Sequence, residues 1–262
     1  MTVITIGNYK GGVGKTSLTE LLAYVFGTKY NYKVLVVDLD PSAQISRRLK
    51  KDFNIKERFP THTFFEAIVE NEVDGAIMKV HKNIDIVHGS RDIEYFSKYV
   101  YKNFNEEAEH YLFKKLFSDV IEEYDYVLID TKPSTSVETV NAICMSDYHL
   151  IASDAKFGGL DASIDEFNFL QAQLEFNPKL DLIGVVAIIV ENKPEQLRIV
   201  DQLKDTFNDM FFENYIKSSA RILKWSDTGI SEEEHWDKVS MEMYQAVADE
   251  ALERIKQLEE SK

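Results

Sequence analysis

The residues best suited to chemistry form a glycine-rich loop near the start of the chain, with the sequence Gly7-Asn8-Tyr9-Lys10-Gly11-Gly12-Val13-Gly14-Lys15-Thr16-Ser17. Glycines at positions 11, 12 and 14 allow backbone N–H groups to turn inward toward an anion. A helix that begins here would add the partial positive charge of its N-terminus. The Lys15 ammonium can reach the β- and γ-phosphates of a nucleotide, and the Thr16 hydroxyl can bind Mg²⁺. The loop therefore predicts a nucleotide-phosphate site.

Three carboxylates come at the ends of apolar runs and are the next candidates. Asp38 and Asp40 follow Val34-Leu35-Val36-Val37, and Asp130 follows Tyr126-Val127-Leu128-Ile129. Open parallel sheets bind their ligands at the carboxyl ends of the strands. A carboxylate there can hold Mg²⁺ through water or orient an attacking water, since phosphoryl transfer depends mostly on positioning and charge stabilisation. One such acid alone could equally cap the next helix, but three of them behind this loop favour chemistry.

The loop and the acids need a sheet to hold them, and the pattern predicts one. Val3-Ile4-Thr5-Ile6 is a buried strand, and Leu18, Leu21, Leu22 and Val25 recur at helical spacing behind the loop. Further strands are predicted over 34–37, 83–88, 126–130, 148–153 and 182–190, and a last one ends at Ile216. Helices are predicted over 91–101, 106–122, 136–146, 160–175 and 194–208, and from about Ser240. This alternation predicts a three-layer α/β fold, a mostly parallel twisted sheet with helices on both faces.

Two segments have weaker patterns. We expect residues 42–83 to form a small helical insertion over the nucleotide site, and the region around Trp225 and Trp236 to be a loop. With no repeat, low-complexity linker or Pro/Gly-rich hinge, residues 1–262 are predicted to form a single domain. Nothing resembles a signal peptide or a membrane span, so a cytoplasmic protein is expected. A single cysteine, Cys144, excludes a disulfide framework and a cysteine-rich metal site within one chain.

The order K-G-G-V-G-K-T, V-V-D-L-D-P, Y-D-Y-V-L-I-D-T resembles the ParA-type partition ATPases of the ParA/MinD superfamily. Members share a P-loop NTPase fold and a deviant Walker A loop with an extra lysine, here Lys10. The resemblance implies that ATP and Mg²⁺ are bound, that ATP is hydrolysed, and that Lys10 reaches the phosphates held by a partner subunit. It assigns the nucleotide to a set of loop residues: Gly11, Gly12, Val13, Gly14, Lys15, Thr16 and Ser17.

The same resemblance assigns roles to the acids and to two late segments. Thr16, Asp38 and Asp130 would hold Mg²⁺ and its waters, while Asp40 would assist hydrolysis together with Lys10 and Lys15. Glu191, Asn192 and Ser218 would contact adenine or ribose. Because the first predicted strand begins at Val3, we expect no N-terminal helix-turn-helix domain, as in the small class of ParA proteins.

The chain departs from the family pattern in places that concern its partners. Tyr9 replaces a motif glycine, and Lys132 follows Asp130-Thr131 where the family often has proline. The formal net charge is −15, and segment 231–260 holds ten acids against three basic residues. The strongest basic candidate for DNA is segment 45–58, with six basic and two acidic residues, a net +4 that leaves −19 elsewhere. Non-specific DNA binding is thus inferred from the family, against the overall charge.

The leading hypothesis is an ATP-dependent homodimer that binds DNA non-specifically and moves a plasmid or chromosome with a ParB-like partner. It would then be associated with the nucleoid. The alternative is a cargo-positioning ATPase that docks on a protein or membrane complex without touching DNA. A metabolic synthetase of the same fold is less favoured because such enzymes usually lack the extra lysine. Direct membrane binding is not expected, because the polar face of the last helix is mostly acidic.

Overall fold

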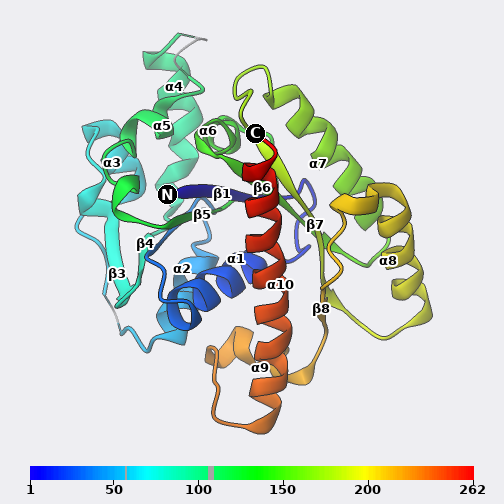
Figure 1. Cartoon of the computed structure of the whole chain (residues 1–262). Coiled ribbons are helices and arrows are strands. Elements are labelled where there is room, and N and C mark those ends of the chain that lie inside the picture. The colour runs from blue at the N-terminus through cyan, green and yellow to red at the C-terminus, as the bar shows by residue number, and fades with distance from the viewer. Residues whose placement is uncertain (57, 106–108) are drawn as a thin grey trace.

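The apolar runs form one eight-stranded sheet in the computed structural model, which describes residues 1–56, 58–105 and 109–262 (Figure 1). In chain order the strands are β1 (Thr2–Gly7), β2 (Val34–Asp38), β3 (Ile77–His81), β4 (Ile84–Val87), β5 (Tyr126–Asp130), β6 (Tyr148–Asp154), β7 (Asp181–Val190) and β8 (Ile216–Lys217). Across the sheet their order is β3-β4-β2-β5-β1-β6-β7-β8. Every neighbouring pair is parallel except β3 with β4, so the carboxyl ends of β2, β5 and β1 meet at one edge.

Helices cover both faces of the sheet, as predicted. One face carries α1 (Lys15–Tyr24), α2 (Gln44–Asp52), α9 (Ala220–Thr228) and the long α10 (His235–Glu260). The other face carries α3 (Phe64–Glu70), α4 (Phe96–Asn103), α5 (Leu112–Leu116), α6 (Val137–Met145), α7 (Gly159–Gln173) and α8 (Pro194–Phe207). Single helical turns complete the chain: η1 (Val25–Lys29), η2 (Asp74–Ala76), η3 (Arg91–Tyr95), η4 (Ile121–Glu123) and η5 (Asn208–Met210).

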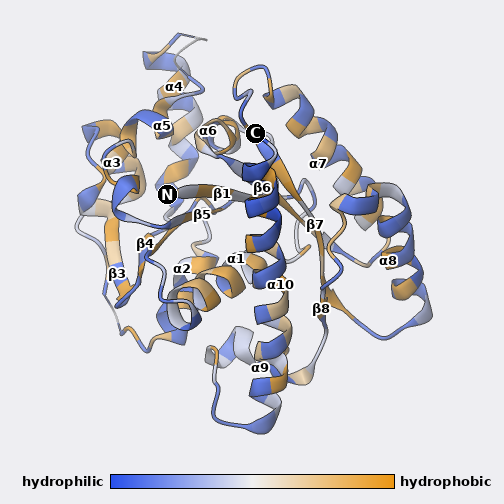
Figure 2. Cartoon of the chain, in the orientation of Figure 1, coloured by the Kyte–Doolittle hydropathy of each residue, from blue (hydrophilic) through white to orange (hydrophobic). Residues whose placement is uncertain are grey.

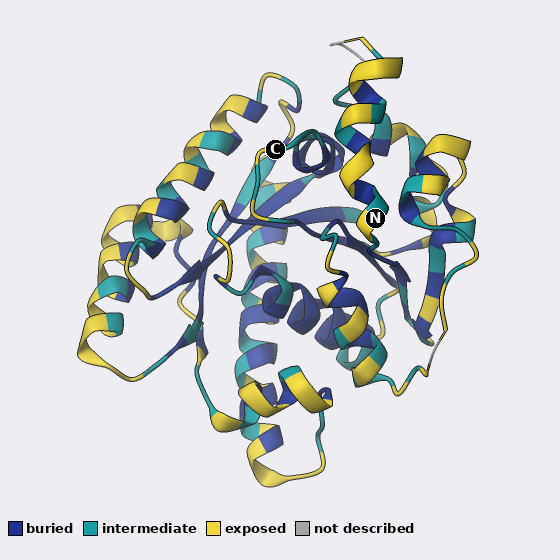
Figure 3. Ribbon diagram, turned by 180° about the vertical axis from the view of Figure 1, so that it is seen from behind, coloured by how far each residue is buried: buried dark blue, intermediate teal, exposed yellow. Residues whose placement is uncertain are grey.

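Hydrophobic residues concentrate on the strands and on the inward sides of the helices (Figure 2), and the central strands are buried on both faces (Figure 3). Even-numbered residues of β1 such as Ile4 pack under α1 and α10, while Val3 faces the α3–α6 side. Burial on both faces explains why these strands read as continuous apolar runs rather than as alternating ones.

Several sequence predictions are corrected here. Residues 42–83 contain not only helices but also β3, an antiparallel strand at the edge of the sheet. Only α5 and the turn η4 lie in the described part of the predicted helix 106–122, and residues 106–108 fall outside the described residues. Neither tryptophan lies in a loop. Trp225 lies in the separate helix α9, and Trp236 lies in α10, because the last helix begins at His235 rather than near Ser240. The last strand, β8, has two residues, Ile216 and Lys217.

Candidate functional site

The glycine-rich loop connects β1 to α1 and is shaped to leave room for a ligand. Gly12 and Gly14 have φ angles of +75° and +100°, in the left-handed region that L side chains rarely adopt. A Cβ atom added to Gly12 would meet no atom of the described chain within 4 Å. Gly14 precedes the first residue of α1, so the unpaired N–H groups of that helix begin beside the loop. This geometry provides the backbone donors that a phosphate group needs.

Lys15 is the cation of this loop, and it is almost buried. Its ammonium donates to the carbonyl oxygens of Asn8 at 2.9 Å and Lys10 at 3.2 Å, both in the same loop. Burial lowers the pKa of Lys15, while the negative charges of nearby carboxylates, Asp130 first, oppose this shift. A partly desolvated ammonium whose partners in the described chain are carbonyl oxygens is suited to pair with an anion such as phosphate.

Asp38 and Asp130 lie opposite each other on the adjacent strands β2 and β5. Thr16 Oγ1 donates to Asp130 Oδ2 at 2.8 Å, which joins the loop to this pair. Asp38 accepts hydrogen bonds from the Ser46 backbone and hydroxyl, and a Cβ on Gly89 would fall 2.6 Å from its carboxyl carbon. Burial raises the pKa of Asp38 to about 6, and burial together with the charge of Asp38 raises that of Asp130 to about 7.

These features fit a divalent cation. The charge of Asp38 lies close enough to raise the pKa of Asp130, and a cation beside the two carboxylates would relieve that repulsion. Across the described chain no three His, Cys, Asp or Glu residues are grouped tightly enough to hold a metal alone. A Mg²⁺ ion at Thr16 would therefore take its remaining oxygen ligands from water and phosphate, which is its usual preference.

A cavity of about 210 Å³ opens at this edge, and most of the predicted phosphate-site residues line it. Its walls are Gly12, Gly14, Lys15, Thr16, Ser17, Asp40, Gln44, Arg48, Thr131, Pro133 and Ile189. Asp40 thus reaches the cavity, and its part in hydrolysis stays a prediction. Two predicted loop residues do not line it: Val13 is buried in the core, and the Cβ position of Gly11 faces Pro133.

The three residues predicted to contact the base lie together in a second cavity, of about 240 Å³. Glu191, Asn192 and Ser218 line it with Tyr215 and Lys217. The end of β7 connects the two cavities, since Ile189 lines the first and Val190 the second. Ile189 has a φ of +56°, a strained conformation for a β-branched residue, and the strand register shifts there.

Lys10 takes a different position from Lys15. Its ammonium contacts both carboxylate oxygens of Asp154, at 3.0 and 3.1 Å, and donates to the carbonyl oxygen of Phe157 at 3.0 Å. The Phe157 side chain is 97% exposed. Lys10 does not line the 210 Å³ cavity of its own chain. The second lysine of the loop is therefore held at an exposed rim.

Sequence reasoning missed several residues of the site. Asp154 holds Lys10 across 144 residues of sequence, a contact that no local pattern predicts. Ser46, eight residues after Asp38, holds that carboxylate and was also missed. Arg48 was grouped with the basic segment 45–58, yet it points inward and lines the cavity. Two further basic side chains of that segment have partners: Lys50 lies over the Phe59 ring at 4.0 Å, and Lys51 donates to Asp227 O at 2.9 Å. Glu57 of this segment lies outside the described residues.

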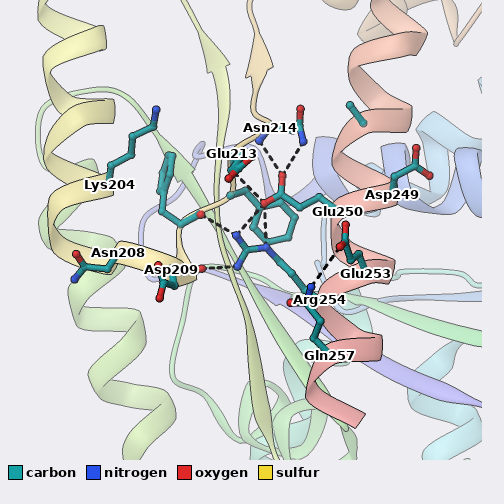
Figure 4. Close-up of a pocket in the computed structure, with 13 residues that line it drawn as sticks. Lys204, Asn208, Asp209, Glu213, Asn214, Asp249, Glu250, Glu253, Arg254 and Gln257 are labelled. Atoms are coloured by element: carbon teal, nitrogen blue, oxygen red, sulfur yellow. Dashed lines mark hydrogen bonds and ion pairs between the residues drawn. The ribbon is translucent and has the colours of Figure 1, made fainter. Parts of the chain in front are cut away.

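A larger cavity, of about 1050 Å³, lies elsewhere, between the end of α8 and α10 (Figure 4). Its centre is an ion pair between Arg254 and Glu250, with Nη2 to Oε1 at 2.9 Å. Both partners are also bonded to nearby backbone groups (Figure 4). None of the predicted site residues lines this groove.

Comparison with known proteins gives the family. Over residues 1–182 the chain matches the family model AAA_31, described as an AAA domain. The chain belongs to this family. Within it the chain is a ParA-type ATPase of the ParA/MinD superfamily, which confirms the resemblance and the predicted fold.

Three relatives of this ParA-type chain illustrate the match. The sporulation initiation inhibitor protein Soj of Bacillus subtilis is 24% identical, covering 84% of this chain and 85% of Soj. The structure of a plasmid partition protein from Borrelia burgdorferi bound to AMPPNP has a TM-score of 0.77 at 25% identity, covering 97% and 98% of the two chains. The apo McdA structure from Cyanothece has a TM-score of 0.81 at 19% identity, covering 96% and 99%.

The described residues include no helix long and apolar enough to cross a membrane.

Proposed function

We propose that two copies of this ParA-type ATPase bind Mg²⁺–ATP face to face and separate after hydrolysis to ADP and phosphate. The observation that carries the proposal is the separation of the two loop lysines. Lys15 lines the phosphate cavity of its own chain, whereas Lys10 is held outside it, at the rim that carries Asp154 and the exposed Phe157. Lys10 therefore lies where it can complete the site of a partner subunit, by exchanging its ion pair with Asp154 for the partner's phosphates. The AMPPNP in the Borrelia partition protein supports the choice of nucleotide.

Within each site the chain's own residues divide the work. The loop N–H groups, Lys15 and Ser17 bind and orient the phosphates. Thr16 and the pair Asp38 and Asp130 hold the cation and its waters. Asp40, at the edge of the same cavity, orients the attacking water. Bound Mg²⁺ supplies neutralisation of charge on the transferred phosphoryl group. Glu191, Asn192 and Ser218 line the cavity that receives the base.

The test compares two loop lysines with a lysine remote from the loop. K15A removes the cis cation, so both ATP binding and ATP-dependent dimerisation should be lost. K10A should retain ATP affinity within about threefold but fail to dimerise. K33A, just before β2 at the opposite edge of the sheet, is the matched control and should behave as wild type. Light scattering with ATP reads the mass, and normal dimerisation of K10A would refute the shared site.

We further propose that the dimer binds DNA without sequence preference and acts in plasmid or chromosome partition with a ParB-like partner. In that role the protein works in the cytoplasm, on the nucleoid. The support is membership in the ParA-type group and the exposed basic side chains of α2 and its flank, such as Arg47. Retention of the ATP-bound protein on non-specific DNA, weakening as salt rises, is the expected result.

One observation favours the alternative, an ATPase that positions a protein cargo without contacting DNA. Two basic residues of the C-terminal half pair with acidic neighbours: Arg221 with Glu234 and Asp237, and Lys193 with Glu191. Because α10 also carries excess acid, this flank would repel a phosphate backbone. Absence of DNA retention at low salt, with ATP-dependent dimerisation intact, would select this alternative.

A further inference from the structure

Arg48 occupies a place in the phosphate site that its sequence context did not announce. It lies on α2, and its Nη1 atom donates to Ser17 Oγ at 3.0 Å and to Glu20 Oε2 at 2.7 Å. Ser17 and Glu20 belong to α1, the helix that begins at the phosphate loop. The Arg48 side chain is only 15% exposed, and it lines the same cavity as Lys15 and Thr16. This arrangement fixes an arginine at the wall of the nucleotide site.

The guanidinium has donors to spare. An arginine has five N–H groups on three nitrogens. In the described part of the chain only Nη1 of Arg48 makes a hydrogen bond, so Nε and Nη2 have no protein acceptor there. These donors lie on a side chain that lines the cavity, where a ligand or water can meet them. Phosphate oxygens are the acceptors that a planar guanidinium fork matches best.

The acids behind Arg48 do not cancel its use as a cation. Glu20 lies beside Asp52, and burial raises the pKa of both carboxyls. Glu20 Oε1 and Asp52 Oδ2 are buried and lack hydrogen-bond partners in the described chain, whereas Asp52 Oδ1 accepts from Ile230 N at 2.7 Å. One proton shared by the two carboxyls would satisfy both orphan oxygens. The pair then carries one negative charge, so the cluster with Arg48 is neutral rather than repulsive toward a triphosphate.

We propose that Arg48 is a phosphate-binding residue of the ATP site, anchored by Glu20 and Ser17 so that its free N–H groups contact a phosphate oxygen of the bound nucleotide. The inference rests on the proposed function, since it assigns a further ligand contact to the same cavity. It also makes α2 part of the nucleotide site, so that ATP would hold α1 and α2 together. The helix that carries Arg48 also carries the exposed Arg47, which points away and bonds to Ser42 O.

The test measures the dissociation constant of a fluorescent N-methylanthraniloyl-ATP with Mg²⁺. Removing Arg48 alone would strand the Glu20 charge, so the decisive comparison is E20Q against the double variant E20Q/R48A. E20Q keeps an oxygen acceptor for Arg48 and should bind within twofold of wild type. E20Q/R48A should bind about 10- to 100-fold more weakly, the loss typical of a charge-assisted hydrogen bond. R48K, which lacks the fork, should fall between.

Two controls separate the possible failures. R47A removes the same charge from the adjacent exposed position of α2 and should bind as wild type. Inorganic tripolyphosphate, used as a competitor, should lose affinity for E20Q/R48A by the same factor as the nucleotide, because the missing contact is to phosphate. If E20Q/R48A matches E20Q with both ligands, Arg48 does not bind phosphate and the inference is wrong. If K15A also binds ATP normally, the proposed site itself is wrong.

Discussion

Two regions of the molecule concentrate charge in cavities, and they treat it in opposite ways. The groove beside α10 is the larger, about 1050 Å³ against about 210 Å³ at the phosphate loop. In the groove Arg254 donates to the carbonyl oxygens of Asp209 and Phe211, at 2.7 and 2.9 Å, and lies over the Phe212 ring (Figure 4). Glu250 accepts from the backbone N–H groups of Glu213 and Asn214. The charges at the centre of the groove are therefore paired.

At the phosphate loop the charged side chains are only partly paired. Among the described residues, Lys15 donates to two carbonyl oxygens and Arg48 pairs with Glu20 but keeps N–H groups without a protein acceptor. Asp38 and Asp130 lie opposite each other on adjacent strands. Buried charge that the protein does not satisfy itself is expensive, and it is retained where a ligand completes it. The comparison teaches that cavity size is a poor guide here. The ligand site is the cavity whose charged side chains keep donors without a protein partner in the described chain. In the groove the charged side chains at the centre are paired and form a clamp that holds α10 to the turn before β8.

The largest expected effect comes from removing the charge in each region with the same substitution type. R254M should lower the free energy of unfolding by about 3 kcal/mol, because Glu250 and several backbone carbonyls lose their partner. K15M leaves two carbonyls unpaired but also removes a desolvated ammonium, so its loss should be about 1 kcal/mol. Urea denaturation measures both. ATP binding should show the reverse order, lost in K15M and unchanged in R254M.

A second variant tests whether the stability lost in R254M comes from leaving the Glu250 carboxylate unpaired. R254M/E250Q removes both charges of the groove, so it should recover part of the stability that R254M loses, as expected when the cost is an unpaired buried carboxylate. Equal losses of stability in K15M and R254M would contradict the division into a ligand site and a clamp.

The next effect is a pH dependence confined to the ligand site. The folded pKa of Asp130, about 7, lies above the value near 3.9 of an unfolded aspartate. The folded state therefore binds this proton more tightly than the unfolded state. In EDTA the contribution of Asp130 to stability is full below about pH 4 and is lost as pH rises to about 7. The slope approaches about 1.4 kcal/mol per pH unit.

D130N should remove this slope, because asparagine does not titrate. The measurement is the free energy of unfolding from urea titrations at pH 5, 6, 7 and 8, with wild type and D130N compared at each pH. D119N, at an exposed position in the turn after α5, serves as the matched control and should parallel wild type. Parallel curves for D130N and wild type would show that Asp130 is ionised throughout and that the strain of the paired acids is absent.

The ligand site could largely be predicted from sequence, and the clamp could not. Lys15, Thr16 and Ser17 lie within one loop, and Asp38 and Asp130 each end an apolar strand, so local pattern and the rule for parallel sheets bring them together. Arg254 looks like any solvated charge on an acidic helix, because its partners at Asp209 and Phe211 are more than forty residues away in sequence. The edge strand β3 was missed for a related reason: its alternating pattern is short and half exposed.

Arg48 and Lys10 show where the same reasoning stopped within the site. A run of basic residues is usually a solvated face, and the exposed Arg47 fits that description. Arg48 differs only because α2 turns it toward α1, a rotation set by Ile45 and Leu49 packing into the core. The role assigned to Lys10 across an interface stays a prediction, and its contact with Asp154 could not be read from either residue's neighbours.

The smallest expected effect comes from backbone strain at Ile189, in the wall of the phosphate cavity. Ile189, on the wall of the phosphate cavity, has a φ of +56°, which costs a β-branched residue roughly 1–2 kcal/mol. I189G should raise the free energy of unfolding by up to about 1 kcal/mol, since relief of strain exceeds the loss of a half-exposed side chain. N71G, at the C-cap of α3 with the same φ, should change it by only a few tenths of a kcal/mol. Because strain persists where function over-determines the backbone, I189G should also bind ATP several-fold more weakly. A stabilised I189G with unchanged affinity would show that the strain belongs to the bulge in β7 and not to the ligand site.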